Sequence, residues 1–230
     1  MLRFKELSTY IKTDPEWLSC ALLVESYTAK DNPKFGSDHG FYHWITVADT
    51  AYDLTLMAGY GEHTATLAKI AGLLHDWGLI FGDNNHATLS AALARTYLKT
   101  HFGDKHPLKN TEIDVICHAI AHHSDGKEMA NIVDAAVLFA DKVHVCSGRI
   151  NDACNDILRE AAKIKRVSFG LTNGFLVLNY QTREDFNPEL FFSAWPKAFD
   201  APARVAHFLG RSFKLFLNNN NYLPMTNTAP

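Results

Sequence analysis

Two adjacent side chains that bind metals well, His75 and Asp76, follow an apolar stretch of the chain. A chain with 12 His contains a His-Asp pair about once by chance, so the pair alone says little. Other candidate ligands lie before and after it, on separate expected helices: His43, His86, His122, His123 and Asp141. Imidazole nitrogens combined with carboxylate oxygens suit Zn, Fe, Mn, Co or Ni, whereas an all-oxygen set would favour Mg or Ca. The set therefore predicts one or two divalent transition-metal ions.

Asp76 is the carboxylate that we expect to bridge the ions if two of them bind, because it stands directly beside His75. A bridged pair of ions would hold a phosphoryl group and lower the pKa of a bound water. This chemistry predicts hydrolysis of a phosphate bond by a metal-bound hydroxide.

The elements that must position these residues are expected to be helices converging on one point, a common way to build a metal site. Asp14 is a good N-cap, and Pro15 suits the first helical position after it. The segment 64–74 is apolar almost all round, so we expect it to be buried. Periodicity and breaks predict helices over 14–30, 38–58, 64–74, 86–100, 110–123, 131–145 and 151–164.

After residue 165 the pattern changes from helical to strand-like. Segments 167–171 and 175–180 flank Thr172-Asn173-Gly174, a strong hairpin signal. Two short helices, at 187–195 and 201–209, and a strand at 213–217 are expected to follow. The phenylalanines of this region are interpreted as core packing rather than a base-stacking surface. We predict a helical domain over 1–165, a small α+β appendage over 166–218 and a flexible tail over 219–230.

The composition limits the classes of partner. The net charge is −3, which argues against a stable nucleic-acid partner. No apolar run suggests a signal peptide or a membrane span, and the four Cys show no CxxC spacing. A cytoplasmic protein without membrane contact is expected. The appendage could cover the bundle, gate the substrate or form a homodimer.

The ordered series His43, His75-Asp76 and Asp141 resembles the HD-domain phosphohydrolase superfamily. The apolar run ending in His75-Asp76, and the segment Ala140-Asp141-Lys142-Val143, are similar to segments of that family. The resemblance covers about residues 38 to 150. It implies a mainly α fold, an HD-domain helical bundle carrying the small C-terminal α+β appendage, and a metal-dependent hydrolase.

The additional histidines resemble those of dinuclear members, which place extra ligands at positions like His86 and His122-His123. The segment from His122 to Gly126 is similar to one in cyclic-dinucleotide phosphodiesterases, but their Gly-Tyr-Pro signature is absent after Gly126. This departure weighs against cyclic-di-GMP cleavage. Other similar members hydrolyse diadenosine polyphosphates, and some are diiron oxygenases with nearly the same ligands.

Residues outside the ligand set receive more modest interpretations. Lys142 and Arg149 follow the last ligand and are candidates to contact substrate phosphate. The alternative for Lys142 is an ordinary solvated helix lysine. His118 is expected to be structural or to orient a ligand. The remaining histidines are interpreted as surface or capping residues: His39, His63, His101, His106, His144 and His207.

The expected function is hydrolysis of a phosphoester or phosphoanhydride in a small, nucleotide-like phosphorylated substrate. Metal binding is assigned to His43, His75, Asp76, His86, His122, His123 and Asp141, and catalysis to Asp76, Lys142 and Arg149. The first alternative is a diiron oxygenase that uses the same ligands. The second is a nucleotide sensor that binds without catalysis.

Overall fold

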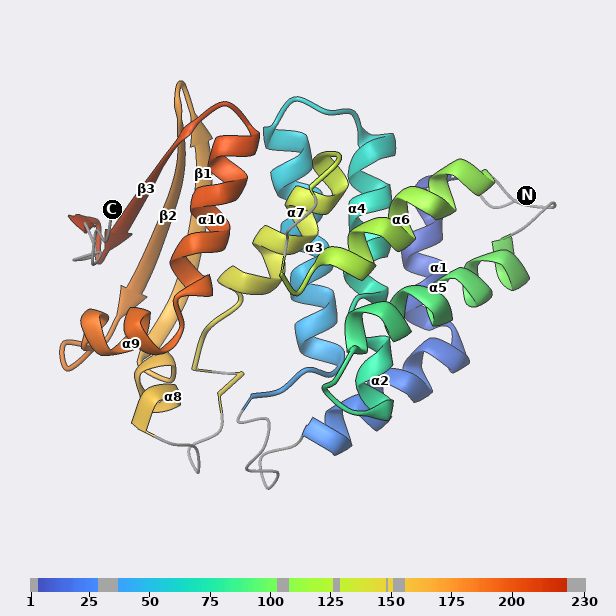
Figure 1. Ribbon diagram of the computed structural model, residues 1–230, viewed down its shortest axis with the longest axis horizontal. Helices are drawn as coiled ribbons and strands as arrows, with labels where there is room; N and C mark the ends of the chain where they lie inside the picture. Colours follow the sequence, from blue (N-terminus) through green and yellow to red (C-terminus); the bar gives the residue numbers. More distant parts are fainter. Residues whose placement is uncertain are drawn as a thin grey trace. The chain divides into compact units, whose positions relative to one another are not determined.

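A computed structural model describes residues 4–28, 37–102, 108–125, 129–147, 149–150 and 156–222 of the chain (Figure 1). The chain divides into two compact units. The first comprises Met1–Ala29 and His39–Asp141, and the second comprises Lys30–Asp38 and Lys142–Pro230. The domain boundary predicted at residue 165 stays a prediction.

The first unit begins with the 3-10 helix η1 (Phe4–Glu6), followed by α1 (Leu7–Thr13) and α2 (Pro15–Thr28). Asp14 caps α2 as predicted, because its Oδ1 accepts hydrogen bonds from the backbone N–H groups of Glu16 and Trp17. The indole N–H of Trp17 donates to the carbonyl of Leu73 at 2.8 Å. This bond ties α2 to the C-terminal end of the helix that precedes His75, α4 (Glu62–Leu74).

Helices α3 (Phe41–Met57) and α4 (Glu62–Leu74) pack closely side by side (Figure 1). Gly72 makes this close approach possible, since a Cβ there would lie 2.6 Å from the Cα of Ala48 on α3. Every residue of α4 from Ala65 to Leu74 except Lys69 is buried. The predicted burial of this helix is therefore confirmed.

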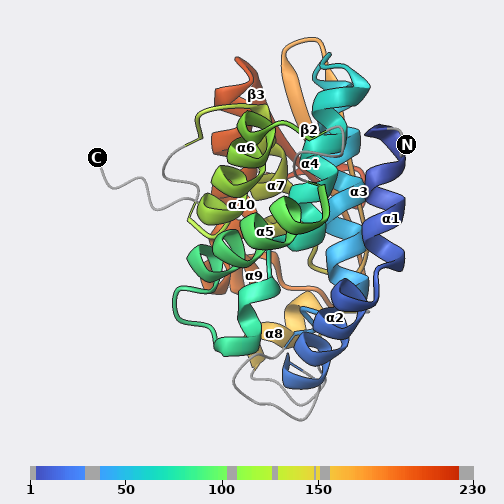
Figure 2. The ribbon, with the colours of Figure 1, turned by 90° about the vertical axis from the view of Figure 1, so that its right-hand side faces the viewer.

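The 3-10 helix η2 (Trp77–Phe81) leads from α4 towards α5 (His86–Phe102), which lies beside α6 (Asn110–His122; Figure 2). Gly78 lets η2 approach the start of α5, because a Cβ there would lie 2.4 Å from the carbonyl oxygen of His86. Helix α7 (Ile132–Val143) is the last of the helices that carry candidate ligands. Among the residues described, no helix has the length and apolar character needed to cross a membrane.

The second unit contains α8 (Asp156–Ala161) and a four-stranded sheet. Strands β1 (Ile164–Thr172) and β2 (Phe175–Thr182) form the predicted antiparallel hairpin. Strand β3 (Ser212–Leu217) pairs parallel with β2, and β4 (Asn220–Tyr222) pairs antiparallel with β3. Helices α9 (Pro188–Ala194) and α10 (Lys197–Phe208) link β2 to β3.

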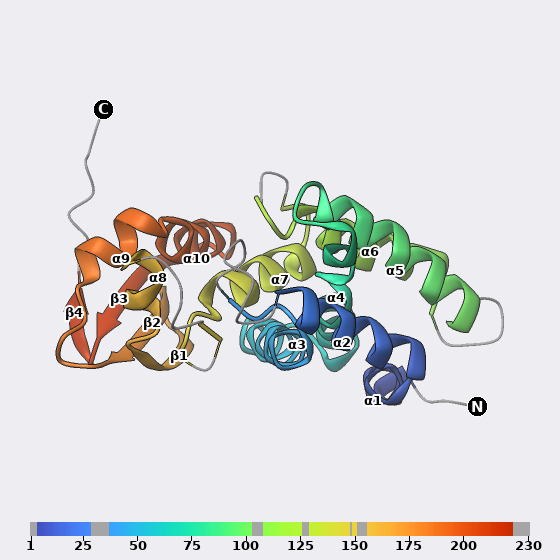
Figure 3. The same cartoon turned by 90° about the horizontal axis from the view of Figure 1, so that it is seen from below.

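The core of this unit lies between the sheet and its helices, which cover one face of the strands (Figure 3). Leu176, Leu178 and Tyr180 alternate along β2 and are fully buried on that face, as period-two patterning requires. Phe191 and Phe192 of α9 are buried as well, which confirms the packing role expected for these two rings. The mainly α fold with a small C-terminal α+β unit is thus confirmed.

Several element boundaries differ from the predictions. Helix α6 ends at His122 rather than at the predicted residue 123, and Lys109 is its N-cap, where the Glu112 carboxylate accepts from the Lys109 backbone N–H. Ile164 belongs to β1 rather than to the preceding helix. The segment predicted as a flexible tail contains β4, while residues 223–230 lie outside the described part. Helix α10 begins earlier than predicted and accommodates Pro202 in its interior.

Candidate metal centre

Five helical elements bring six of the seven predicted ligands together, all except His122. Each ligand comes from a defined place in the fold, mostly a helix end. His43 lies in the first turn of α3, and His75 and Asp76 directly follow α4. His86 is the first residue of α5, and His123 follows the last residue of α6, while Asp141 lies near the end of α7. The end of a helix lets its backbone turn, so neighbouring side chains can point to a common centre.

One group of ligand atoms surrounds the Oδ2 oxygen of Asp76. The Nε2 atoms of His43 and His75 lie 3.5 and 3.3 Å from this oxygen and 3.1 Å from each other. Oδ1 of Asp141 lies 3.3 Å from His43 Nε2 and 3.8 Å from His75 Nε2. All four side chains are buried. The spacing allows His43, His75 and Asp141 to hold one ion together.

A second group surrounds the other carboxylate oxygen, Oδ1 of Asp76. His123 Nε2 lies 3.3 Å from it and His86 Nε2 lies 3.5 Å from it. The two Nε2 atoms are 3.2 Å apart. Asp76 therefore presents one oxygen to each of two histidine pairs, which is the arrangement required of a carboxylate that bridges two ions.

Backbone carbonyls fix the protonation pattern of three of these imidazoles. The Nδ1 atoms of His75, His86 and His123 lie 2.7–2.9 Å from the carbonyl oxygens of Gly72, Asp83 and Ile120 respectively. A carbonyl can only accept, so each Nδ1 must carry the hydrogen. In the neutral rings, each Nε2 is left with its lone pair facing the cluster. Such a hydrogen bond at the far nitrogen is typical of metal-binding histidines.

The facing lone pairs of His86 and His123 require something positive between them. Both Nε2 atoms would act as acceptors at 3.2 Å, an unfavourable contact unless a proton or a cation lies there. The Ser124 hydroxyl is 3.2 Å from His86 Nε2 and 3.4 Å from His123 Nε2, but its one hydrogen can serve only one of them well. The residues thus fit a bound cation.

The charges of the centre follow from burial and from the neighbours of Asp76. Burial alone would raise the pKa of Asp76, but the surrounding histidines, His75 first among them, hold this pKa well below its usual value. Burial lowers the pKa of His123 and favours its neutral, ligand-competent form. Burial also opposes protonation of His75, yet Asp76 and Asp141 raise its pKa overall. The ionised carboxylate of Asp76 favours a bound cation.

His39 belongs to this centre, although we predicted a surface or capping role from the sequence. Its Nδ1 lies 2.8 Å from Oδ2 of Asp76, and its backbone N–H donates to the Thr28 hydroxyl. Together with His43 and Asp76 it forms a further group able to hold an ion. The available sequence signal was its position four residues before His43, one helical turn, but α3 begins only at Phe41.

His122 and His123 are separated by the structure, whereas both were predicted as ligands. His123 joins the cluster, but His122 is in none of the ligand groups found among the described residues. The ring of His122 instead lies 4.5 Å from that of His118. His118 bonds to the buried Asp134, whose carboxylate also accepts from the backbone at the start of α7. This supports the structural role predicted for His118, and a ligand role for His122 stays a prediction.

The predicted phosphate-binding residues belong to the second unit, so their place relative to the cluster stays a prediction. Arg149 is buried and donates from Nε to the carbonyl of Asp38 and from a terminal nitrogen to that of His144. These bonds give Arg149 a structural role within its unit. Lys142 is half-buried near the end of α7.

The other histidines show mixed outcomes. His63, with 55% of its side chain exposed, and His207 are surface residues as predicted. His144 is buried, so the surface alternative of its prediction is wrong, while the capping alternative stays a prediction for this residue, which directly follows α7. His101 is half-buried and bonds through Nδ1 to the carbonyl of Tyr97. His106 lies outside the described residues.

Comparison with known proteins agrees with the geometry. Residues 40–151 match the HD domain family. The chain is also similar to Ribonuclease Y 1 of Pediococcus pentosaceus, with 31% identity over 130 residues, which are 55% of this chain and 22% of that protein. It therefore spans about a fifth of this relative's length. HD domains bind divalent metals and are associated with metal-dependent phosphohydrolases. The matched segment contains His43, His75, Asp76, His86, His123 and Asp141, so most of the His and Asp cluster lies within the region that is similar to HD domains.

Proposed function

We propose that this protein hydrolyses a phosphoester or phosphoanhydride bond of a small, nucleotide-like substrate with the help of two divalent transition-metal ions. The observation that carries the proposal is that the two carboxylate oxygens of Asp76 face different histidine pairs. Oδ2 faces His43 and His75, and Oδ1 faces His86 and His123. A carboxylate shared in this way suits two ions rather than one.

The ligands divide between the two ions according to these distances. His43, His75 and Asp141 would hold the first ion, and His86 and His123 would hold the second, with Asp76 contacting both. His39 is an added candidate on the Oδ2 side. When bound, a pair of such ions polarises phosphoryl oxygens and activates water for attack on phosphorus.

The protein's own residues prepare this centre before any ion arrives. The carbonyls of Gly72, Asp83 and Ile120 hold three imidazoles in the tautomer that offers Nε2 to the centre. The lowered pKa of Asp76 keeps its carboxylate ionised at neutral pH. Preorganised, ionised ligands reduce the rearrangement that binding requires, which favours both metal affinity and catalysis.

The name of the relative in Pediococcus pentosaceus refers to a ribonuclease, which breaks phosphodiester bonds of RNA. Phosphodiesters therefore belong in the first substrate panel beside phosphomonoesters and nucleoside polyphosphates. Lys142, next to Asp141 in the chain, is the residue that we assign to contact a substrate phosphate.

The test compares Asp76→Asn with the wild type, using bis-p-nitrophenyl phosphate, p-nitrophenyl phosphate, nucleotides and short oligoribonucleotides. Bound metals are counted in each preparation by inductively coupled plasma mass spectrometry. We expect activity to fall at least about a hundredfold, since even an outer-shell partner of a metal ligand contributes 10–100-fold. The matched control is Asp114→Asn, because Asp114 is an exposed carboxylate that pairs with Arg95.

Full phosphatase activity in Asp76→Asn would refute the proposal. A second outcome would replace the proposal with the oxygenase hypothesis. In that case, wild-type protein purified without oxygen would contain iron and consume oxygen, and it would show no hydrolysis with Mn, Co, Ni, Zn or Fe. Binding of nucleotides without turnover under the same conditions would instead favour a sensor.

A further inference from the structure

The second unit has a sheet face that its own helices leave uncovered. Helices α9 and α10 pack on the face of the sheet that carries Leu176, Leu178 and Tyr180. The intervening residues, Val177 and Asn179, point to the opposite face. By the strand register, the alternate residues of β1 from Arg166 to Thr172 and of β3 from Ser212 to Phe216 share that face.

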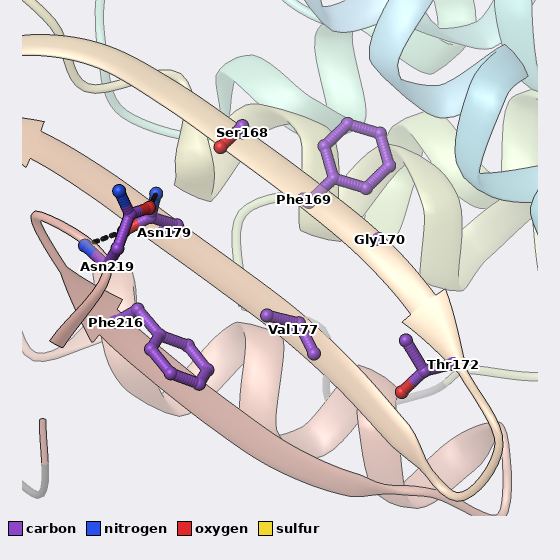
Figure 4. Close-up of a pocket in the computed structure, with 8 residues that line it drawn as sticks. All are labelled: Ser168, Phe169, Gly170, Thr172, Val177, Asn179, Phe216 and Asn219. Carbon is purple, nitrogen blue, oxygen red and sulfur yellow. Dashed lines mark hydrogen bonds between the residues drawn. The ribbon is translucent and has the colours of Figure 1, made fainter. Parts of the chain in front are cut away.

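This open face is hollowed around Gly170 (Figure 4). The hollow has a volume of about 420 Å³, and its lining includes Ser168, Gly170, Val177, Asn179 and Phe216. A Cβ built on Gly170 would meet nothing within 4 Å. A glycine in the middle of a strand weakens the strand, so it often marks a place where another molecule approaches closely. The open space above Gly170 is consistent with such an approach.

The residues around the hollow offer a flat aromatic surface together with hydrogen-bonding groups. Phe216 lies beside Asn179 across the β2–β3 pairing and is half-buried. The Asn179 amide N–H donates to the Asn219 side-chain oxygen at 2.8 Å, which fixes the orientation of both amides (Figure 4). Farther along the face, the Lys214 ammonium lies 3.6 Å from the centroid of the Phe175 ring.

The open face is positively charged, unlike the whole chain with its net charge of −3. Arg166 and Lys214 are its cations, and the alternate strand positions that form the face in β1, β2 and β3 include no Asp or Glu. A second copy docking face to face would bring two positively charged faces together. A polyanion with planar groups is a better match in charge and in shape.

We propose that this sheet face binds a single-stranded nucleic acid, with one base stacked on Phe216 beside Asn179, a neighbouring nucleotide over Gly170, and the backbone phosphates near Lys214 and Arg166. Aromatic side chains on an open sheet, with cations following the backbone, are a general means of binding unpaired strands. The expectation of no stable nucleic-acid partner rested on the charge of the whole chain, whereas this binding is local and weak. It is separate from hydrolysis at the metal centre.

Fluorescence anisotropy with labelled octamers of uridylate and of deoxythymidylate tests the proposal on the full chain. The chain carries Asp76→Asn, so that cleavage does not consume the probe, and binding is read whether or not the centre is hydrolytic. We expect binding of both octamers, because stacking is shared by RNA and DNA.

Two variants test the stacking, so the result does not depend on a single substitution that could disturb the fold. Phe216→Leu should weaken binding about 5- to 150-fold, the range for loss of one stacked base. Gly170→Val should fill the hollow and weaken binding as well. Because valine suits a strand and space is available, this variant should unfold at a temperature no lower than that of the unmodified chain. Unchanged affinity in Gly170→Val would overturn the proposal.

Salt dependence tests the two cations separately. With about two phosphate contacts to a single strand, the logarithm of affinity should fall against the logarithm of salt with a slope of about −1.4. Lys214→Gln should reduce the slope to about −0.7. The control is Lys165→Gln, since Lys165 is exposed at the bulge where the β1–β2 register shifts. Equal losses in both variants, or no binding by the unmodified face, would contradict the proposal.

Discussion

The two units use polar residues in opposite ways. In the helical unit, His43, His75 and Asp76 are removed from water and point at one another. In the sheet unit, most buried positions are apolar, with few buried charges such as Arg149 and Glu160, and polar groups such as Asn179 lie on an open face. Burying charged groups together is costly unless they are paired or bind a metal. The helical unit bears this burial cost at the candidate metal centre. The core of the sheet unit is mainly apolar, so it bears less of this cost.

The largest expected effect tests the two-sided character of the sheet. Leu178→Ala removes a fully buried side chain and should lower the free energy of unfolding by about 2–5 kcal/mol. Val177→Ala, on the neighbouring residue of the open face, should lower it much less. Urea denaturation followed by circular dichroism measures both. Equal losses would show that the two faces are equally packed.

A second prediction concerns the close approach of α3 and α4. Gly72→Ala would push a methyl group against the backbone of Ala48, and should lower the free energy of unfolding by about 1–3 kcal/mol. Because Gly72 also accepts the bond that orients His75, metal affinity should fall too. Gly61→Ala is the control, since a Cβ there meets open space. Denaturation and metal titration would show whether the two effects occur together.

Much of the site could be predicted from the sequence because its ligands sit at recognisable helix ends. His75 and Asp76 close a strongly apolar helix, and His86 opens another after Asn84-Asn85. The choice between His122 and His123 could not be made, because it depends on where α6 stops turning. His39 was missed because its role depends on a loop path outside any periodic element, held by the Thr28 hydroxyl.

The sheet unit shows the same limit in another form. The hairpin around Gly174 was predictable, because turn residues separate two strand-like segments. The short strand β4 was not, since Asn220 and Asn221 have low strand propensity and pair only because β3 lies beside them. Phe216 and Phe191 look alike in sequence, yet Phe191 is buried, whereas the register places Phe216 on the open face.

A third prediction follows from the newly found His39. His39→Ala should weaken metal binding about 10- to 100-fold, because the residue contacts the bridging Asp76 at its periphery. Isothermal titration with Mn or Co gives the affinity. His63→Ala provides the control, since His63 is exposed and pairs with Glu112. An unchanged affinity in His39→Ala would remove His39 from the centre.

The smallest expected effects concern pH and differ in sign between two histidines of metal-free protein. Burial lowers the pKa of His123 in the folded protein. On acidification this residue therefore takes up a proton in the unfolded chain before it does so in the folded chain, and stability falls as the pH drops below about 6.5. The pKa of His75 is raised despite burial, so its contribution is present below that pH and is lost as pH rises through the folded pKa. Unfolding measured from pH 5 to 8 should lose acid sensitivity in His123→Gln and gain it in His75→Gln. The same change in both variants would contradict this assignment.

The central claim is that Asp76 bridges two metal ions. The most direct measurement is crystallographic anomalous scattering at the absorption edge of the bound metal, with the sites refined beside both carboxylate oxygens. We predict two peaks, one near Oδ2 with His43, His75 and Asp141, and one near Oδ1 with His86 and His123. A single peak in crystals saturated with metal, or a second peak that does not contact Asp76, would contradict it.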